Sequence, residues 1–185
     1  RQLKRVMPLV SMRNYAAVAP RGVEAADSLN GFRWPQSERH IALAERRVEE
    51  ALFAAEDRFH VAASRIFLAG LGEGGTMALR VALGNPLRYA GAISLGGAFP
   101  HGQRPLRNIN AARRLPILVA TGRDSVRYRE SQVCRDLRLF HAAGLSVNLR
   151  QYPCGDELTT VMLSDMDRWM MEVICPTHST ANADC

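Results

Sequence analysis

The stretch Gly70-Leu71-Gly72-Glu73-Gly74-Gly75 decides the fold of this chain. It follows a short apolar run at 65–69, typical of a buried strand, and precedes a helical pattern at 75–84. Glycines at positions 70, 72 and 74 suit a sharp turn and close packing of the helix. The sequence therefore predicts a strand, a tight turn at Gly72 and a helix. Because glycine has no side chain, Gly72 supplies no nucleophile.

The length of 185 residues and the hydrophobic fraction of 47% fit one domain with a sizeable core. We expect this domain to span residues 1–174 and residues 175–185 to form a flexible tail. Four cysteines show neither CxxC spacing nor a pattern of metal ligands, and the sequence predicts no metal site and no cofactor. Reduced thiols predict a cytoplasmic protein.

The formal net charge is +6, but the basic residues are spread along the chain rather than clustered. Nucleic-acid recognition usually needs such clustering on one face, so we expect no nucleic-acid partner. No apolar run is long enough to span a bilayer.

Strand patterns alternate with helix patterns along most of the chain. The predicted strands are 15–19, 65–69, 90–95, 116–121 and 146–152, and the predicted helices are 2–12, 37–58, 75–84, 129–143 and 161–174. This alternation predicts an α/β fold, a mostly parallel sheet with helices on both faces and functional sites at the carboxyl ends of the strands. The polar alternation at 146–152 indicates an edge strand.

The phrases RIFLAGLGEGGTMALRVALGNP, YAGAISLGGAFP, LPILVATGRDS and CGDELTTVMLSDMDRWM resemble the α/β-hydrolase fold. More closely, residues 14–174 are similar to the phospholipase/carboxylesterase family, which includes acyl-protein thioesterases. The resemblance implies a three-layer sandwich. It also implies hydrolysis of carboxylic esters and thioesters by a serine, an aspartate and a histidine, in that chain order.

Carried over residue by residue, the nucleophile position of the family falls on Gly72. The residue whose N–H contributes to the oxyanion hole falls on Glu73, and the acid falls on Asp124 or as readily on Ser125. The histidine position falls on Asp156, within the phrase Gly155-Asp156-Glu157. A carboxyl group with a pKa of about 4 cannot replace imidazole as a proton shuttle at neutral pH.

In the family, a strand ending in an H-G-G-type loop donates a second oxyanion N–H, and no such phrase precedes Tyr15. The N-terminal strands are therefore expected to be absent, with a gap between the strands at 15–19 and 65–69. Buried unpaired backbone groups there would cost about 1–3 kcal/mol each. Either the sequence is a fragment, or these two strands pair directly, or a protein partner or a second copy donates a strand beside residues 15–19.

With nucleophile, base and oxyanion loop all missing, we expect the chain not to be an enzyme. It would be a catalytically inactive relative that serves as a structural or protein-interaction subunit of a larger assembly. The alternative is an ester or thioester hydrolase with a non-standard site, or with a pocket that binds a ligand. p-Nitrophenyl ester turnover separates these hypotheses.

The expected remnant of the pocket contains Glu73, Phe32, Trp34, Ser125 and Glu157. Its carboxylates could bind a cation or carry out acid–base chemistry, or they could be solvated and paired with arginines such as Arg127. The aromatic pair could receive an acyl chain or pack over the turn. The stripe Met162, Met166, Trp169, Met170 and Met171 is expected to be core rather than a binding surface.

Overall fold

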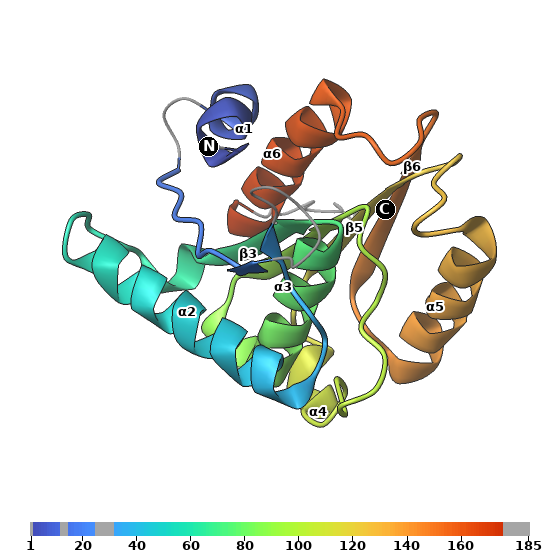
Figure 1. Ribbon diagram of the computed structural model, residues 1–185, viewed down its shortest axis with the longest axis horizontal. Coiled ribbons are helices and arrows are strands. Elements are labelled where there is room, and N and C mark those ends of the chain that lie inside the picture. Colours follow the sequence, from blue (N-terminus) through green and yellow to red (C-terminus); the bar gives the residue numbers. More distant parts are fainter. Residues whose placement is uncertain (1, 12–14, 25–31, 176–185) are drawn as a thin grey trace, which may run out of the picture.

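The structure is a computed structural model that describes residues 2–11, 15–24 and 32–175 (Figure 1). Its helices are α1 Gln2–Val10, α2 Glu38–Glu56, α3 Glu73–Gly84, α4 Ile109–Ala112, α5 Glu130–Ala143 and α6 Thr160–Ile174. Its strands are β1 Val23–Glu24, β2 Phe32–Arg33, β3 Phe67–Leu71, β4 Gly91–Leu95, β5 Ile117–Gly122 and β6 Val147–Tyr152.

The main sheet has four parallel strands in the order β3-β4-β5-β6. Every residue of β4 and β5 is buried, as expected for central strands that are covered on both faces. The predicted edge position of β6 is confirmed, and β3 forms the opposite edge of this sheet. A separate antiparallel pair joins β1 to β2.

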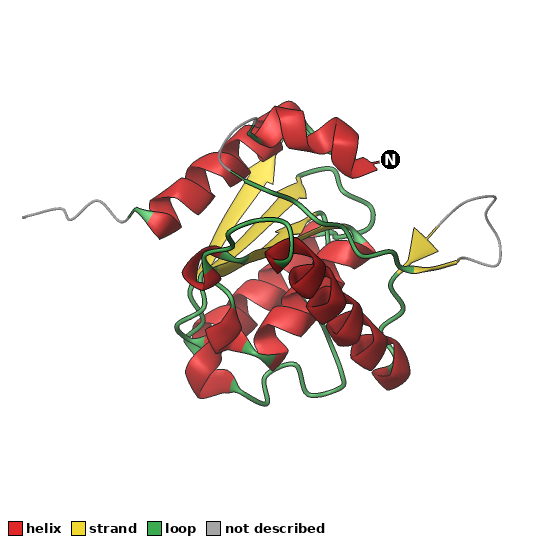
Figure 2. Ribbon diagram, turned by 90° about the vertical axis from the view of Figure 1, so that its left-hand side faces the viewer, coloured by secondary structure: helices red, strands yellow, loops and turns green. Residues whose placement is uncertain are grey.

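Two apolar layers enclose the sheet because successive side chains of a strand point to opposite faces. On one face Ile117 and Val119 pack in a cluster with side chains of α2, α3 and α5. On the other face Leu118 and Ala120 pack with side chains of α1 and α6. Figure 2 shows the sheet between these helical layers. The predicted three-layer α/β sandwich is confirmed.

Residues 15–19 form no strand, so that prediction is wrong. They run as an extended segment, and the described sheet ends at β3 rather than pairing with them. An apolar run becomes a strand only where a neighbour offers hydrogen bonds, and the sequence pattern does not report the neighbour. The short β1–β2 pair was not predicted, and β3 lies two residues later than the predicted strand at 65–69.

The methionine stripe is largely core, as predicted. Met162, Met166, Trp169 and Met170 are buried in the layer formed with α1, whereas Met171 is 38% exposed. In the part of the chain that the structure describes, no helix is both long and apolar enough to cross a bilayer. The expected cytoplasmic location stays a prediction, and so does the tail, which falls almost entirely outside the described residues.

Candidate active site

The predicted strand-to-helix turn is present at Gly72, between β3 and α3. Gly72 has φ 54°, in the range that glycine adopts readily. Its N–H donates to the carbonyl of Leu95 at 2.8 Å, and its own carbonyl accepts from the N–H groups of Gly75 at 2.9 Å and Thr76 at 3.1 Å. The turn is therefore tied both to the neighbouring strand and to the first turn of the helix.

Close packing around this turn depends on Gly70, Gly75 and Gly97. A Cβ at Gly70 would overlap the backbone of Gly74, and a Cβ at Gly97 would overlap the carbonyl of Gly72. A Cβ at Gly75 would come within 2.5 Å of Ser94 Oγ. At Gly74, by contrast, it would meet the Trp34 ring at an ordinary 3.6 Å. The close helix packing that we expected of Gly74 is therefore provided by Gly75.

Glu73 begins α3, and its backbone N–H has no hydrogen-bond partner among the described residues. Its carboxylate accepts from Arg33 Nη2 at 2.7 Å and from the backbone N–H of Trp34 at 3.3 Å. The hydrogen bond from Arg33 is the main reason that the pKa of Glu73 is lowered. The carboxylate is thus engaged, while the N–H stays available to a ligand. Sequence reasoning did not anticipate Arg33, because it lies 40 residues from Glu73.

Arg127 brings a cationic group to the turn. Its Nη1 lies 3.8 Å from the point where a Cβ on Gly72 would stand. Its Nε lies 4.0 Å from Asp156 Oδ2, so the guanidinium lies between the turn and that carboxylate. Together with the Glu73 N–H, Arg127 forms a corner that can stabilise negative charge developing on a carbonyl oxygen.

The loops after β5 and β6 bring Ser125 against Asp156. Ser125 Oγ donates to Asp156 Oδ1 at 2.5 Å. The loops can approach because Gly122 has no side chain, and a Cβ there would overlap the carbonyls of Cys154 and Gly155. Asp124 lies exposed beside them. Of the two residues onto which the acid position was carried, the structure places Ser125 in contact with Asp156.

Asp156 is held as a carboxylate. The hydrogen bond from Ser125 is the main cause that lowers its pKa, and the backbone N–H groups of Arg127 and Val126 and the charge of Arg127 lower it further. These hydrogen bonds converge on Oδ1 from Ser125 and Arg127. Oδ2 therefore keeps acceptor capacity for a proton or a water molecule. The pairing of a pocket carboxylate with Arg127 was among the predicted alternatives.

The two aromatic residues differ in their surroundings. Trp34 packs against the first turn of α3. Of the two alternatives for the aromatic pair, this is packing over the turn. Phe32 is 45% exposed and lies under the guanidinium of Arg21, with 5.0 Å between the cation and the ring centroid. Glu157 is exposed at the surface. No group of three potential metal ligands occurs among the residues that the structure describes.

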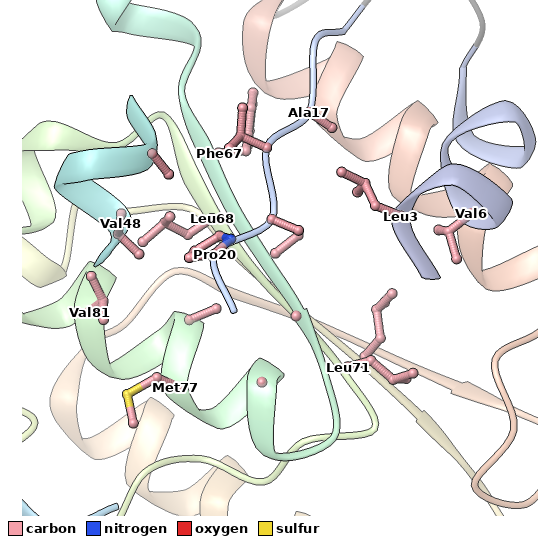
Figure 3. A pocket seen from close by; sticks show the side chains of 18 of the residues that line it. Leu3, Val6, Ala17, Pro20, Val48, Phe67, Leu68, Leu71, Met77 and Val81 are labelled. Carbon is pink, nitrogen blue, oxygen red and sulfur yellow. The ribbon is translucent and has the colours of Figure 1, made fainter. Parts of the chain in front are cut away.

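A large cavity begins at Gly72 and follows β3 along its length. Its volume is about 2260 Å³. Figure 3 shows apolar side chains pointing into it from both helical layers, including Leu3 of α1, Val48 of α2 and Val81 of α3. Phe32, Trp34, Glu73 and Arg127 also line it at the end beside the turn. The turn and the cationic corner therefore open into an apolar space.

The parallel sheet, the two helical layers and the strand-to-helix turn define an α/β-hydrolase fold. Residues 16–173 match the family model described as phospholipase/carboxylesterase, and the chain belongs to this family. The expected family resemblance is confirmed.

Solved structures share the fold at low sequence identity. Arabidopsis thaliana SOBER1 is 22% identical with a TM-score of 0.62, over 76% of this chain and 68% of that one. The Bacillus cereus carboxylesterase is 17% identical with a TM-score of 0.63, over 83% and 73%. Zea mays acyl-protein thioesterase 2 is 16% identical with a TM-score of 0.60, over 77% and 73%.

Membership in this family contradicts the expectation that the chain is not an enzyme. That expectation rested on Gly72 and Asp156 at the serine and histidine positions and on the lack of an H-G-G-type phrase before Tyr15. Gly72 offers no side-chain nucleophile, but the turn still presents the Glu73 N–H and the nearby guanidinium of Arg127, which in turn lies 4.0 Å from Asp156. Transition-state stabilisation can come from such groups without a side-chain nucleophile.

Proposed function

We propose that the chain hydrolyses carboxylic esters or thioesters at the carboxyl end of β3, with water in place of a side-chain nucleophile. The observation that carries the proposal is the corner at Gly72, where the N–H of Glu73 has no partner among the described residues and Arg127 Nη1 lies 3.8 Å from the point where a Cβ on Gly72 would stand. A substrate carbonyl placed there gains stabilisation as its oxygen becomes negative. Family membership supports the reaction class.

Asp156 acts as the general base in this proposal, a less efficient one than the imidazole it stands in for, because it holds the proton only while the intermediate exists. Its Oδ2 accepts a proton from water as the water oxygen bonds to the carbonyl carbon, giving a tetrahedral intermediate. Collapse of the intermediate breaks the carbon–oxygen or carbon–sulfur bond. The leaving alcohol or thiol takes the proton from Asp156, so one water is consumed for one acid and one alcohol or thiol. The low pKa of Asp156 makes it a weak base, which predicts slow turnover.

The apolar cavity is suited to the acyl part of the substrate. Leu68, Leu71 and Met77 line it close to the turn, and burial of acyl methylenes contributes about 0.8 kcal/mol each. Longer acyl groups should therefore lower KM. In this proposal the ester or thioester bond is cleaved beside Gly72, and the acyl chain binds to the apolar side chains along β3.

The test is turnover of p-nitrophenyl acetate and butyrate by the purified chain, compared with a heat-treated sample. We expect turnover that falls by about 10²–10⁴-fold in Asp156→Asn, the range that general bases contribute. Arg123→Ala, which changes an exposed arginine on the facing loop after β5, is the matched control and should retain the activity. Butyrate should give the lower KM.

A fluorophosphonate probe distinguishes water from a side chain as the nucleophile. The wild-type chain should form no covalent adduct. The double variant Gly72→Ser/Asp156→His, which places serine and histidine at the two family positions, should become labelled. Wild-type turnover at the background level, or full activity in Asp156→Asn, would refute the proposal.

A further inference from the structure

The inner face of α5 carries a carboxylate in the middle of an apolar stripe. The buried residues of this helix are Val133, Asp136, Phe140 and Ala143, which share one face at helical spacing. Asp136 is fully buried there. Burial of a carboxylate costs free energy unless hydrogen bonds and nearby charges compensate for it. The partners of Asp136 therefore show which segments this residue holds together.

Asp136 binds two loops at the carboxyl end of the sheet. Its Oδ2 accepts from the Tyr128 hydroxyl at 2.8 Å, in the loop after β5, and from the backbone N–H of Phe99 at 3.4 Å, in the loop after β4. His101 Nε2 lies 3.3 Å from Oδ1, which has no hydrogen bond among the described residues. One buried carboxylate thus joins α5 to the loops after β4 and β5.

The connection through Tyr128 continues to the proposed general base. The Tyr128 ring is buried, and its backbone N–H donates to Ser125 Oγ at 2.9 Å. Ser125 Oγ in turn donates to Asp156 Oδ1. Arg127 lies between Ser125 and Tyr128 in the chain, so the same anchor holds the backbone that carries its guanidinium. Burial, and then the hydrogen bond to Asp136, raise the pKa of Tyr128, so its hydroxyl stays a donor.

The connection through the loop after β4 leads to the turn at Gly72. Gly97 lies so close to this turn that a Cβ on it would overlap the carbonyl of Gly72. Thr76 Oγ1, in the first turn of α3, donates to the carbonyl of Ala98 at 2.8 Å. The next residue along the chain is Phe99, whose N–H donates to the buried carboxylate. The loop that backs the turn is therefore fixed between α3 and α5.

We propose that Asp136 is a positioning residue, which holds the turn at Gly72 and the Ser125–Asp156 pair at fixed positions relative to each other. Because it is fully buried, it acts through the two loops rather than on the substrate. Without this anchor, the Tyr128 N–H no longer fixes the Ser125 oxygen, and the Ser125 hydroxyl can turn away from Asp156. The role in turnover rests on the proposed function, whereas the anchoring itself does not.

The test is the pKa of Asp156, followed by NMR of isotope-labelled aspartate carboxyl groups, which needs no turnover. Tyr128→Phe removes the hydroxyl that binds Asp136. It should raise the pKa of Asp156 toward the ordinary aspartate range, because the hydrogen bond from Ser125 is the main cause that lowers it. The variant leaves in place the other charged side chains on the two loops that meet at Asp156, which are Arg123, Asp124, Arg127, Arg129 and Glu157.

Tyr152→Phe is the matched control for loss of a tyrosine hydroxyl. It removes a 2.8 Å hydrogen bond to Asp165, and its ring packs on the opposite face of the sheet from Tyr128. The pKa of Asp156 should not change in this variant. Asp136→Asn should also leave it unchanged, because the amide oxygen still accepts from Tyr128.

The double variant Tyr128→Phe/Asp136→Leu separates positioning from stability. It replaces both buried partners by apolar groups, so it should recover much of the stability that Tyr128→Phe alone loses. The pKa of Asp156 should nevertheless be raised, because the anchor is still missing. The double variant also gives a folded chain for the measurement if Tyr128→Phe alone unfolds.

The same variants affect turnover if the proposed function holds. Tyr128→Phe and the double variant should lower kcat for p-nitrophenyl butyrate by about 10- to 10²-fold with KM nearly constant, because a misplaced catalytic group impairs the transition state more than binding. Asp136→Asn should keep most of the wild-type kcat.

An Asp156 pKa equal to that of the wild type in folded Tyr128→Phe or in the double variant would overturn the positioning role. An equal rise in Asp136→Asn and Tyr128→Phe would do so as well. Absence of ester turnover by the wild type would refute the proposed function and leave the NMR result to decide the role of Asp136, so the two proposals can fail separately.

Discussion

Ser125 Oγ lies 2.5 Å from Asp156 Oδ1 and also accepts the backbone N–H of Tyr128 at 2.9 Å. The Ser125 oxygen accepts a hydrogen bond from the Tyr128 N–H. The hydroxyl proton of Ser125 is therefore directed at Asp156. This arrangement fixes the carboxylate in its ionised form and orients Oδ2 toward Arg127.

Ser125→Ala should move the acid limb of the pH–rate profile to higher pH. The hydrogen bond lowers the pKa of Asp156, so the active carboxylate persists above that lowered pKa and is lost as the pH falls through it. Removing the hydroxyl raises the pKa toward the ordinary aspartate range. The measurement is kcat/KM for p-nitrophenyl butyrate against pH, with Val126→Ala as the control at a 70% exposed neighbour. An unmoved acid limb would contradict this prediction.

Arg127→Ala should lower kcat by about 10²-fold, in the range found for loss of one oxyanion donor. Arg127→Lys keeps the charge but not the planar fork, so it should recover part of the loss. Arg123→Ala again serves as the matched arginine deletion. If kcat stays constant and only KM rises, Arg127 binds the substrate but does not stabilise the transition state.

Alanine substitutions at two adjacent glycines of α3 should change the free energy of unfolding in opposite directions. Gly74→Ala should raise the free energy of unfolding by about 0.5–1 kcal/mol, because alanine favours a helix and the new methyl meets the Trp34 ring at ordinary distance. Gly75→Ala should lower it by about 1–3 kcal/mol, because the methyl comes within 2.5 Å of Ser94 Oγ. Urea denaturation measures both. Equal effects would show that the turn is not tightly packed.

Tyr128→Phe should lower the free energy of unfolding by about 1–3 kcal/mol, because it removes a donor from a buried carboxylate. The Tyr128 hydroxyl donates to Asp136 at 2.8 Å, and Asp136 is fully buried. Tyr152→Phe is the matched control. Its partner Asp165 also has Arg150 and Arg168 within 3.5 Å, so a smaller loss is expected. Chemical denaturation of both variants gives the comparison, and the reverse order would contradict it.

Local patterns were sufficient to predict most elements. The helices α2 and α5 were predicted from their apolar periodicity, which reflects contacts close in sequence. The end of α5 was predicted from its C-cap Gly144, which has φ 65°. The turn at Gly72 was predicted for the same reason, because its glycines and flanking elements lie within one short stretch. The strand expected at 15–19 failed, since hydrogen-bond partners come from elsewhere in the chain.

The residues of the candidate site were named only in part from the sequence. Gly72, Glu73 and Asp156 were named from the family resemblance. The role of Arg33 and the closeness of Arg127 to the turn were not, since both depend on loops far apart in sequence. Whether the acid position fell on Asp124 or Ser125 was open by one residue, and only the loop geometry places Ser125 against Asp156.

The sequence by itself determined the alternation of strands and helices, the parallel three-layer class and the absence of a side-chain nucleophile at Gly72. These features depend on residue types and on spacings shorter than one helix. Tertiary structure alone decided that β3 ends the described sheet, that an apolar cavity follows it and that Arg127 joins the turn to Asp156. Those features arise from the packing of distant segments, and no local spacing encodes which surfaces will meet.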